Sequence, residues 1–341
     1  MKDSFGREIN YMRISITRKC DLFCSYCRTR NDASVSAGSD ETGDNANGGD
    51  KRYPTDYELS VIDIYDIACV AASLGINRFK ITGGEPLLRQ DTPQIISRLR
   101  SIPEVKEVTL TTNGVLLGKR INELSESGVD RINVSLDTVN EKDYELLTGR
   151  PVLNEVLDGV RKAVDRNIHV RLNCLNRGPL THAAEIVRVA EDLKTDIRFI
   201  ELMPLGAGKS HDSYSNENII KELTEEFGEP VKINAKAGNG PAVYYLFPKF
   251  DISVGFISAI NNCFCETCNR IRLTSYGTLK PCLCYNTAVD LRNTLALSNE
   301  ELRLRELRSL IEMAVSEKPE RHSFFDIDKV TEEYTMDCIG G

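Results

Sequence analysis

The sequence predicts an α/β fold in which parallel strand–helix units form an open or closed barrel. Helical patterns and short β-rich runs alternate about six times between residues 11 and 201, as expected for parallel βα units. After residue 205 the pattern changes to paired strands. With 341 residues, 41% of them hydrophobic and 28% charged, the chain is long enough for one large domain and a smaller appendage.

The elements follow in a regular order. Thr55 and Glu58 form a capping-box pattern ahead of the first helix, and Gly75 ends that helix. This helix carries the apolar residues Ile62, Tyr65, Val70 and Leu74. Strand-like runs cover residues 11–17, 78–81, 105–110, 131–136, 168–173, 197–201, 243–247 and 252–257. The later helical patterns begin near residue 92 and include residues 121–124, 156–164 and 183–193.

The change of pattern divides the chain into two expected regions, residues 1–205 and residues 206–341. Within the first, residues 31–50 contain four Gly and five acidic residues but no Lys, Arg or aromatic residue. Such a segment cannot bury enough surface to offset its ordering entropy, so we expect a flexible acidic loop. The loop supplies −5 of the net charge of −8.

Charge and composition exclude several classes of protein. A net charge of −8 argues against general binding to nucleic acids or anionic membranes, although a local basic pocket stays open. No apolar run approaches the roughly 20 residues of a membrane span, and the N-terminus lacks the apolar core of a signal peptide. We therefore expect a cytoplasmic protein. Its eleven cysteines then favour metal binding or catalysis over disulfides.

Cys20, Cys24 and Cys27 form a C-x3-C-x2-C group just after the first predicted strand. Three closely spaced thiolates suit a four-iron cluster, in which each binds one iron and the fourth iron stays open. A zinc site would normally need a fourth protein ligand nearby, and this segment contains no His. Buried structural cysteines are the remaining alternative.

Cys265, Cys268 and Cys282 form a second group, with the spacing C-x2-C-x13-C. Cys263 or Cys284 could complete a four-thiolate zinc site or a closed iron–sulfur site. Arg270 and Arg272 follow at i and i+2 of a predicted strand, so both point to one side, where paired guanidinium groups suit phosphate. A solvated strand face is the alternative for these arginines. Cys69 and Cys174 are expected in the core, and Cys338 has no assigned role.

The first cysteine group resembles the motif of the radical S-adenosylmethionine (SAM) superfamily, in which an aromatic residue precedes the last cysteine, as Tyr26 does here. Residues 82–86, Thr-Gly-Gly-Glu-Pro, resemble the segment that receives the methionine ammonium group, and Glu85 supplies a carboxylate. Taken alone, this segment could be an ordinary βα turn. Residues 111–114 and 133–137 follow at the next two strands, in register with the superfamily motifs.

Over nearly the whole chain the sequence resembles one family, molybdenum cofactor biosynthesis protein A, the GTP 3′,8-cyclases. The matching segments include residues 5–7, 198–203, 238–242, 255–258 and the terminal 339–341. The resemblance implies a partial (β/α)6-type TIM barrel of radical SAM type with a C-terminal α+β cluster-binding region. It also implies that the Gly-Gly tail reaches into the active site.

The resemblance implies two [4Fe–4S] clusters, one on each cysteine group, and SAM as cofactor. SAM would contact Tyr26, Gly84, Ser135 and Met203. GTP would contact Arg13, Lys80, Thr111, Arg171, Arg198, Arg270, Ile271 and Arg272. Catalytic roles would fall to Arg13, Arg270, Arg272, Gly340 and Gly341. The implied partners are a flavodoxin or ferredoxin-like electron donor and a downstream cyclic pyranopterin monophosphate synthase, without nucleic acid or membrane, and a homodimer is one assembly open to the chain.

The sequence departs from the family pattern at basic positions. Arg78 and Lys80 stand where the family commonly has Lys and Arg, and Arg171 stands where it usually has Lys. Both swaps retain charge but change geometry, because Arg is a planar fork and Lys a point charge. They put substrate affinity in question. Two rivals remain: another radical SAM enzyme with an auxiliary cluster, such as a peptide-modifying maturase, and a non-enzymatic zinc protein.

Overall fold

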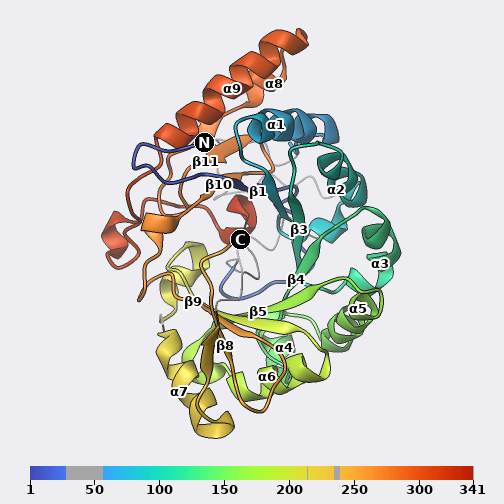
Figure 1. Ribbon diagram of the computed structural model, residues 1–341, viewed down its shortest axis with the longest axis vertical. Coiled ribbons are helices and arrows are strands. Elements are labelled where there is room, and N and C mark those ends of the chain that lie inside the picture. The colour runs from blue at the N-terminus through green and yellow to red at the C-terminus, as the bar shows by residue number, and fades with distance from the viewer. Residues whose placement is uncertain (28–56, 213, 234–238, 341) are drawn as a thin grey trace, which may run out of the picture.

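The computed structural model describes residues 1–27, 57–212, 214–233 and 239–340 (Figure 1). The predicted acidic loop of residues 31–50, Thr55 and the tail residue Gly341 lie outside the described residues. No helix in the described part of the chain combines the length and the apolar character that a membrane span needs.

Strands and helices alternate through the first 201 residues, as predicted. They are β1 (Tyr11–Ser15), α1 (Val61–Ser73), β2 (Arg78–Thr82), α2 (Thr92–Arg100), β3 (Glu107–Thr112), α3 (Leu117–Glu126), β4 (Arg131–Ser135), α4 (Glu141–Thr148), α5 (Leu153–Asp165), β5 (Val170–Asn176), α6 (Ala183–Asp192) and β6 (Asp196–Glu201). The rest comprises α7 (Asn216–Phe227), β7 (Val231–Ile233), β8 (Val243–Leu246), β9 (Val254–Ile257), β10 (Arg270–Leu273), β11 (Thr278–Lys280), β12 (Val289–Asp290), α8 (Arg292–Leu295), α9 (Glu300–Ser316) and α10 (Met336–Ile339).

All described strands join one 12-stranded sheet in the order β12-β11-β10-β1-β2-β3-β4-β5-β6-β9-β8-β7. Strands β1 to β6 pair in parallel and in chain order, and this is the predicted partial barrel. The C-terminal region extends both edges of it, because β10 pairs in parallel with β1 and β9 pairs in parallel with β6. Helices α1 to α6 lie on the outer side of the curved sheet, whereas the short α10 lies near its centre (Figure 1).

Alternation along the strands separates two faces of the sheet. Met12 and Ile14 of β1 are fully buried in the hydrophobic core beneath the helices, and Phe79 and Ile81 repeat the pattern on β2. Successive side chains of a strand point to opposite faces. Arg13, between Met12 and Ile14, is therefore directed to the inner side of the barrel.

The start of α1 corrects one prediction. The capping box consists of Ser60 and Asp63, whose side chains each bond the other's main-chain N–H, and not of Thr55 and Glu58. The same Ser/Thr-x-x-acid pattern occurs twice, and the helix uses the later one. Glu58 instead accepts a hydrogen bond from the Thr17 hydroxyl at 2.5 Å. Ile62, expected with the apolar residues of this helix, is 67% exposed.

Candidate active site between two cysteine groups

The first cysteine group lies on the loop that leaves the carboxyl end of β1. Cys20, Cys24 and Cys27 are half-buried, and the Cys27 N–H donates to the Cys24 carbonyl at 2.9 Å. The main chain of Phe23 donates to the Thr148 carbonyl at the end of α4 at 2.8 Å. A helix end thus fixes the loop, and the three thiols are the donor set that an iron–sulfur cluster takes.

The glycines after β2 let the neighbouring turn pack against this loop. A Cβ atom added at Gly84 would lie 2.5 Å from the carbonyl oxygens of both Arg18 and Lys19, and one at Gly83 would lie 2.6 Å from the Thr17 carbonyl. Only glycine fits such contacts. This close approach is an additional reason for the Gly-Gly pair, which the sequence had connected with SAM alone.

Glu85 is fully buried, and its carboxylate is already occupied by protein donors. It accepts hydrogen bonds from the Leu87 N–H at 2.9 Å, the Thr112 hydroxyl at 2.7 Å and the Asn113 N–H at 2.6 Å. Burial raises the pKa of Glu85 to about 7, although these hydrogen bonds oppose the rise. The carboxylate therefore joins the ends of β2 and β3, next to the first cysteine loop.

The residues that the sequence assigned to SAM lie on the strand ends and the cysteine loop. The Tyr26 hydroxyl donates to the Asp137 carboxylate at 2.5 Å, and burial followed by the charge of Asp137 raises the pKa of Tyr26 well above its usual value. Ser135 is the last residue of β4, and Met203 follows β6. These positions lie at the carboxyl ends of their strands, where barrel enzymes place their chemistry.

The strand register builds a row of cations across three strands. Arg13 on β1 pairs with Arg272 on β10 at one side and with Lys80 on β2 at the other. Because residues in register on parallel strands point to the same face, the three charges share the inner side of the barrel. Arg270 shares the Arg272 face of β10, whereas the side chain of Ile271 faces the hydrophobic core.

Within the described residues, Lys80 and Arg272 are buried, Arg13 and Arg270 are half-buried, and no carboxylate forms an ion pair with any of the four. Burial, then the charge of Arg198, lowers the pKa of Lys80 well below its usual value, and burial with the Arg13 charge does the same for Arg272. The Nε atoms of Arg13 and Arg270 are buried and form no hydrogen bond in the described structure, and neither does the Thr111 hydroxyl. Buried donors without partners are costly, so these groups are arranged for a polyanionic ligand.

Arg198 and Arg171, on the opposite wall, are held by protein partners. Arg198 donates to the Asn173 side chain at 2.7 and 3.0 Å and to the Asn133 side chain at 2.7 Å. Burial lowers the pKa of Arg198 to about 10. Arg171 is paired with Asp196 at 3.2 Å. Arg198 is thus positioned by amides, whereas Arg171 already has a carboxylate partner.

The second cysteine group lies at the other end of the same strands. Because β10 is parallel to β1, Cys268, which precedes β10, lies beside the amino end of β1, whereas Cys20 follows the carboxyl end of β1. Strand β11 returns antiparallel to β10 and brings Cys282 back to the same edge as Cys268. The row of cations therefore lies between the two groups.

Lys318 supplies a buried positive charge beside this second group. Its ammonium group donates to the carbonyls of Arg270 at 2.9 Å and Pro281 at 2.7 Å. Burial alone would raise the pKa of Cys268, but the charges of Lys318 and Arg270 outweigh it and lower that pKa. A Cys268 thiolate is the form that binds iron.

Gly340, the last described residue, lies against β1, β2 and Arg272. The carbonyl of Gly340 accepts a hydrogen bond from Arg272 Nη1 at 2.5 Å. Gly340 has a φ of +75°, and a Cβ atom there would lie 2.8 Å from the Thr82 hydroxyl and 3.1 Å from Ser15 Cβ. The tail is thus seated between β1 and β2 beside the row of cations.

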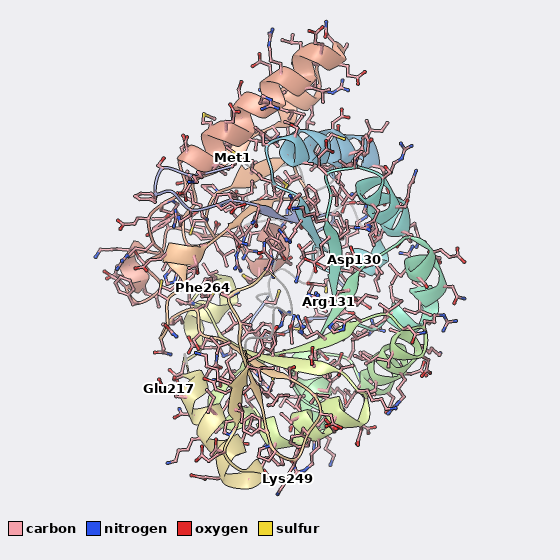
Figure 2. All side chains as sticks on the ribbon, in the orientation of Figure 1. Met1, Asp130, Arg131, Glu217, Lys249 and Phe264 are labelled. Atoms are coloured by element: carbon pink, nitrogen blue, oxygen red, sulfur yellow. The ribbon has the colours of Figure 1, made fainter. Side chains whose placement is uncertain are left out.

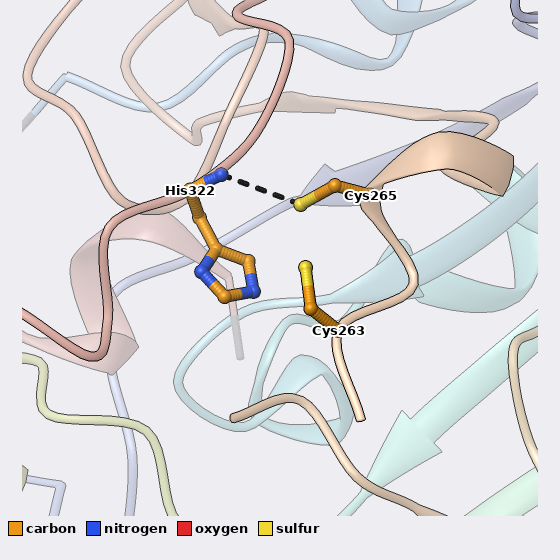
Figure 3. A group of neighbouring side chains, drawn as sticks. All are labelled: Cys263, Cys265 and His322. Carbon is orange, nitrogen blue, oxygen red and sulfur yellow. Dashed lines mark hydrogen bonds between the residues drawn. The ribbon is translucent and has the colours of Figure 1, made fainter. Parts of the chain in front are cut away.

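The structure separates the remaining cysteines. Cys174, Cys284 and Cys338 are buried, and Cys69 packs at the edge of the main hydrophobic core. Cys263 is exposed and lies close to Cys265 and His322 (Figure 3). Burial raises the pKa of Cys265 to about 12, and its contact with Cys263 adds to this.

Several contacts of the site were not predicted from the sequence. Arg131, labelled on β4 in Figure 2, is one of the charges that lower the pKa of Lys80. Asn133 and Asn173 orient Arg198, and Lys318 lies beside the second cysteine group. Arg131 and Asn133 are two residues apart on β4, so their side chains lie on the same face of the strand. This polar spacing is a sequence signal that could have predicted a polar inner face on β4.

Two family models match the chain. The model described as Radical SAM superfamily matches residues 14–182, and the one described as Molybdenum Cofactor Synthesis C matches residues 195–324. Among solved structures, Streptococcus suis SuiB bound to S-adenosylmethionine is 15% identical with a TM-score of 0.58, covering 89% of this chain and 68% of that one. The protein anSMEcpe with bound AdoMet is 15% identical with a TM-score of 0.54, covering 87% and 79%. These likenesses confirm the predicted fold class.

Curated relatives match over the full length. The GTP 3′,8-cyclase of Clostridium perfringens (strain 13 / Type A) is 37% identical over 350 residues and covers 100% of both chains. That of Pelotomaculum thermopropionicum is 34% identical over 349 residues, again with 100% of both chains covered. SAM and two iron–sulfur clusters are the cofactors that accompany these motifs. The sequence motifs, the barrel and its two cysteine groups agree with these matches, and the chain belongs to the GTP 3′,8-cyclase family of radical SAM enzymes.

Proposed function

We propose that this chain converts GTP into (8S)-3′,8-cyclo-7,8-dihydroguanosine 5′-triphosphate, the first step of molybdenum cofactor biosynthesis. One observation carries the proposal: the cations Arg13, Lys80 and Arg272 lie between two three-cysteine groups, and no carboxylate among the described residues neutralises them. Lys80 and Arg272 are buried, and Arg13 is half-buried. A triphosphate supplies the missing negative charge. A SAM-dependent enzyme acting on a neutral peptide would have no need of such a row.

Each cysteine group would hold one [4Fe–4S] cluster through three thiolates. Cys20, Cys24 and Cys27 would hold the first, with SAM near Tyr26, Gly84, Ser135 and Met203. Reduced by one electron and loaded with SAM, this site would supply the 5′-deoxyadenosyl radical that takes the 3′ hydrogen of GTP. The bond from the ribose carbon to C8 of guanine would leave a nucleotide radical, which takes one electron from the reductant and one proton from solvent to give the dihydro product. Cys265, Cys268 and Cys282 would hold the second cluster, facing the guanine.

The protein residues act by binding, orienting and excluding water. Arg13, Lys80 and Arg272 would bind the triphosphate, and Arg270 and Thr111 offer further donors that are buried and unpartnered in the described structure. Several close donors inside a low-dielectric site act far more strongly than in water. Gly340 would hold Arg272 in place through its carbonyl. Arg171 and Arg198 would contribute charge from the opposite wall. The main chain of Ile271, on β10 between Arg270 and Arg272, would offer a hydrogen bond to GTP from the same wall as the cation row.

The cellular setting of the reaction completes the proposal. A flavodoxin or ferredoxin-like protein would supply electrons, and a cyclic pyranopterin monophosphate synthase would take the product. We place the reaction in the cytoplasm and leave the homodimer as the assembly to test by light scattering. Residues 1–205 and 206–341 contribute strands to one sheet. We therefore propose that the two parts differ in function, each carrying one cysteine group, rather than being separate structural domains.

The test is anaerobic turnover by the reconstituted protein. Given SAM, dithionite and GTP, it should form 5′-deoxyadenosine and the cyclised nucleotide in equal amounts, as measured by liquid chromatography and mass spectrometry. Replacing GTP with ATP is the matched control, and it should give no cyclised product. 5′-Deoxyadenosine formed at the same rate without GTP, and no cyclised nucleotide with it, would contradict the proposal.

A further inference from the structure

Cys263, Cys265 and His322 bring three metal-ligating atoms within 4.8 Å of one another. Figure 3 shows the two thiols and the imidazole ring pointing toward one another from the loop before β10 and from the segment after α9. Two of the three, Cys263 and His322, belong to neither proposed cluster. In a tetrahedral zinc site, with Zn–S bonds of about 2.3 Å, the ligand atoms lie about 3.8 Å apart. A small contraction would therefore close this set around one ion.

His322 provides an independent indication of a ligand. The residue is 6% exposed, and its Nε2 atom is buried and makes no hydrogen bond in the described structure. Burial lowers the pKa of His322 despite the nearby main chain of Ala259, which opposes the shift, so the neutral, metal-binding form of the ring is favoured. The backbone holds the residue in place, because the His322 N–H donates to Cys265 Sγ at 3.3 Å. A buried, unpartnered ring nitrogen costs free energy that a metal ion would recover.

The other ring nitrogen is only weakly engaged. His322 Nδ1 accepts a long contact of 3.3 Å from the Phe324 N–H, so the neutral ring carries its proton on Nε2. An ion bound at Nε2 requires that proton to move to Nδ1, and this long contact is lost. The two thiols release their protons to solvent on binding, as metal thiolates require.

A cavity gives the set an entry path and room for a fourth ligand. It has a volume of about 360 Å³, and besides Cys263 and Cys265 its lining includes Phe5, two acidic residues, Glu266 and Glu320, and one further cation, Arg321. Arg7 also lines it, but Asp3 pairs with the Arg7 guanidinium at 2.6 Å, so this charge is compensated. Water or a carboxylate can therefore complete the coordination of a cation.

We propose that Cys263, Cys265 and His322 form a site for one thiophilic divalent ion, of the Zn²⁺ class, open to this cavity. The proposal rests on the proposed function in one respect, because Cys265 is also assigned to the second cluster. One thiolate cannot serve both sites, so the ion binds only when the second cluster is absent. Zinc occupancy would then block iron–sulfur loading of the chain.

The experiment uses the full chain with Cys20, Cys24 and Cys27 replaced by Ser, so that the first group does not compete. Iron-free protein is titrated anaerobically with Zn²⁺ against a chromophoric chelator, and with Co²⁺ to detect thiolate charge-transfer absorption. We expect one ion per chain. Cys263→Ser and His322→Gln should each weaken Zn²⁺ binding at least tenfold, whereas the control Cys284→Ser, which removes a nearby buried thiol, should leave it unchanged.

Iron reconstitution and Zn²⁺ titration of Cys263→Ser and of one further variant, Cys268→Ser, separate the two sites. Cys263→Ser should still take up about four iron atoms, whereas Cys268→Ser should lose them and still bind Zn²⁺. The proposal is overturned if Cys268→Ser weakens Zn²⁺ binding as much as Cys263→Ser does, or if Cys263→Ser loses the iron. Failure of the proposed function would look different: the parent protein itself would take up no iron.

Discussion

At the scale of single residues, Lys80 is the clearest mark of a site built for an anion. It is buried on β2 in register with Arg13 and forms no ion pair with a carboxylate in the described part of the chain. A buried charge without a partner destabilises a fold. Such a residue is retained for binding, so stability and function should respond to its removal in opposite directions.

Lys80→Met should therefore weaken GTP binding and stabilise the protein. We expect the dissociation constant of GTP to rise at least tenfold, about 1.4 kcal/mol, in equilibrium dialysis. The free energy of unfolding without GTP should rise by about 1 kcal/mol or more in urea titrations. Lys119→Met, at an exposed lysine of α3, is the control and should change neither quantity. Equal GTP affinity in Lys80→Met and wild type would contradict the assignment.

The pKa of Lys80 adds a dependence on pH. Burial, followed by neighbouring arginine charges, lowers it in the folded state well below the 10.5 of an ordinary lysine. Between the lowered pKa and 10.5 the unfolded chain binds more protons, so wild-type stability should rise with pH across that window. At pH values below the lowered pKa of Lys80, the fold bears the full free-energy cost of burying the charged ammonium group. The stability difference between wild type and Lys80→Met should accordingly shrink as pH rises, and a constant difference up to pH 10.5 would refute this.

Substitution of Glu85 distinguishes a structural role of its carboxylate from a role in binding SAM. Its three protein donors predict that Glu85→Ala destabilises the iron-free chain by about 2–3 kcal/mol in urea unfolding, since buried partners lose their acceptor. The matched control is Glu123→Ala, which removes a carboxylate of α3 that is 55% exposed and should cost far less. Loss of SAM affinity with unchanged stability would contradict this and support the sequence-based assignment of Glu85 to the methionine ammonium group.

At the scale of elements, the C-terminal helix α10 and its glycine tail make the sharpest prediction. Gly340→Ala should displace the tail, because a Cβ atom there meets the Thr82 hydroxyl at 2.8 Å and the φ of +75° disfavours alanine. The Arg272 contact would be lost, and kcat/KM for GTP should fall at least tenfold while iron content stays unchanged. Gly240→Ala, where a Cβ atom meets nothing within 4 Å, should retain full activity.

The sequence predicted the elements of the barrel well, because each strand is a short β-rich run between helical patterns. It did not predict α4, although Asn140 caps its start and Gly149 ends it with a φ of +78°. The first-helix cap was misplaced because two capping patterns lie five residues apart. That β9 and β10 would extend both barrel edges could not be predicted, since strand pairing joins residues far apart in the chain.

For the candidate site, the sequence predicted the residues of local motifs but not the contacts between distant segments. The cysteine spacings predicted both cysteine groups, and the i, i+2 spacing of Arg270 and Arg272 predicted their shared face, because these are local motifs. Arg13 and Lys80 of the cation row were implied only by the resemblance to the family. The amides of Asn133 and Asn173 around Arg198, and the proximity of His322 to Cys263, arise only when separate segments meet in the fold. Such contacts join residues that are far apart in the chain, so local sequence patterns do not predict them.

At the scale of the whole molecule, the sheet holds the two cysteine groups apart at opposite ends of neighbouring strands. One cysteine group follows the carboxyl end of β1 and the other precedes the amino end of β10, its parallel neighbour. The cations lie between them, inside a protein with a net charge of −8. The positive charge is therefore local to the barrel interior, where it can attract an anionic nucleotide.

The central claim is that GTP bound on these cations presents its 3′ hydrogen to the first cluster and SAM. The most direct test is a single turnover of the reconstituted protein with GTP deuterated at the 3′ position, followed by mass spectrometry of the 5′-deoxyadenosine formed. We expect one deuterium atom in 5′-deoxyadenosine and none at that position of the cyclised nucleotide. Unlabelled 5′-deoxyadenosine formed during turnover would contradict it.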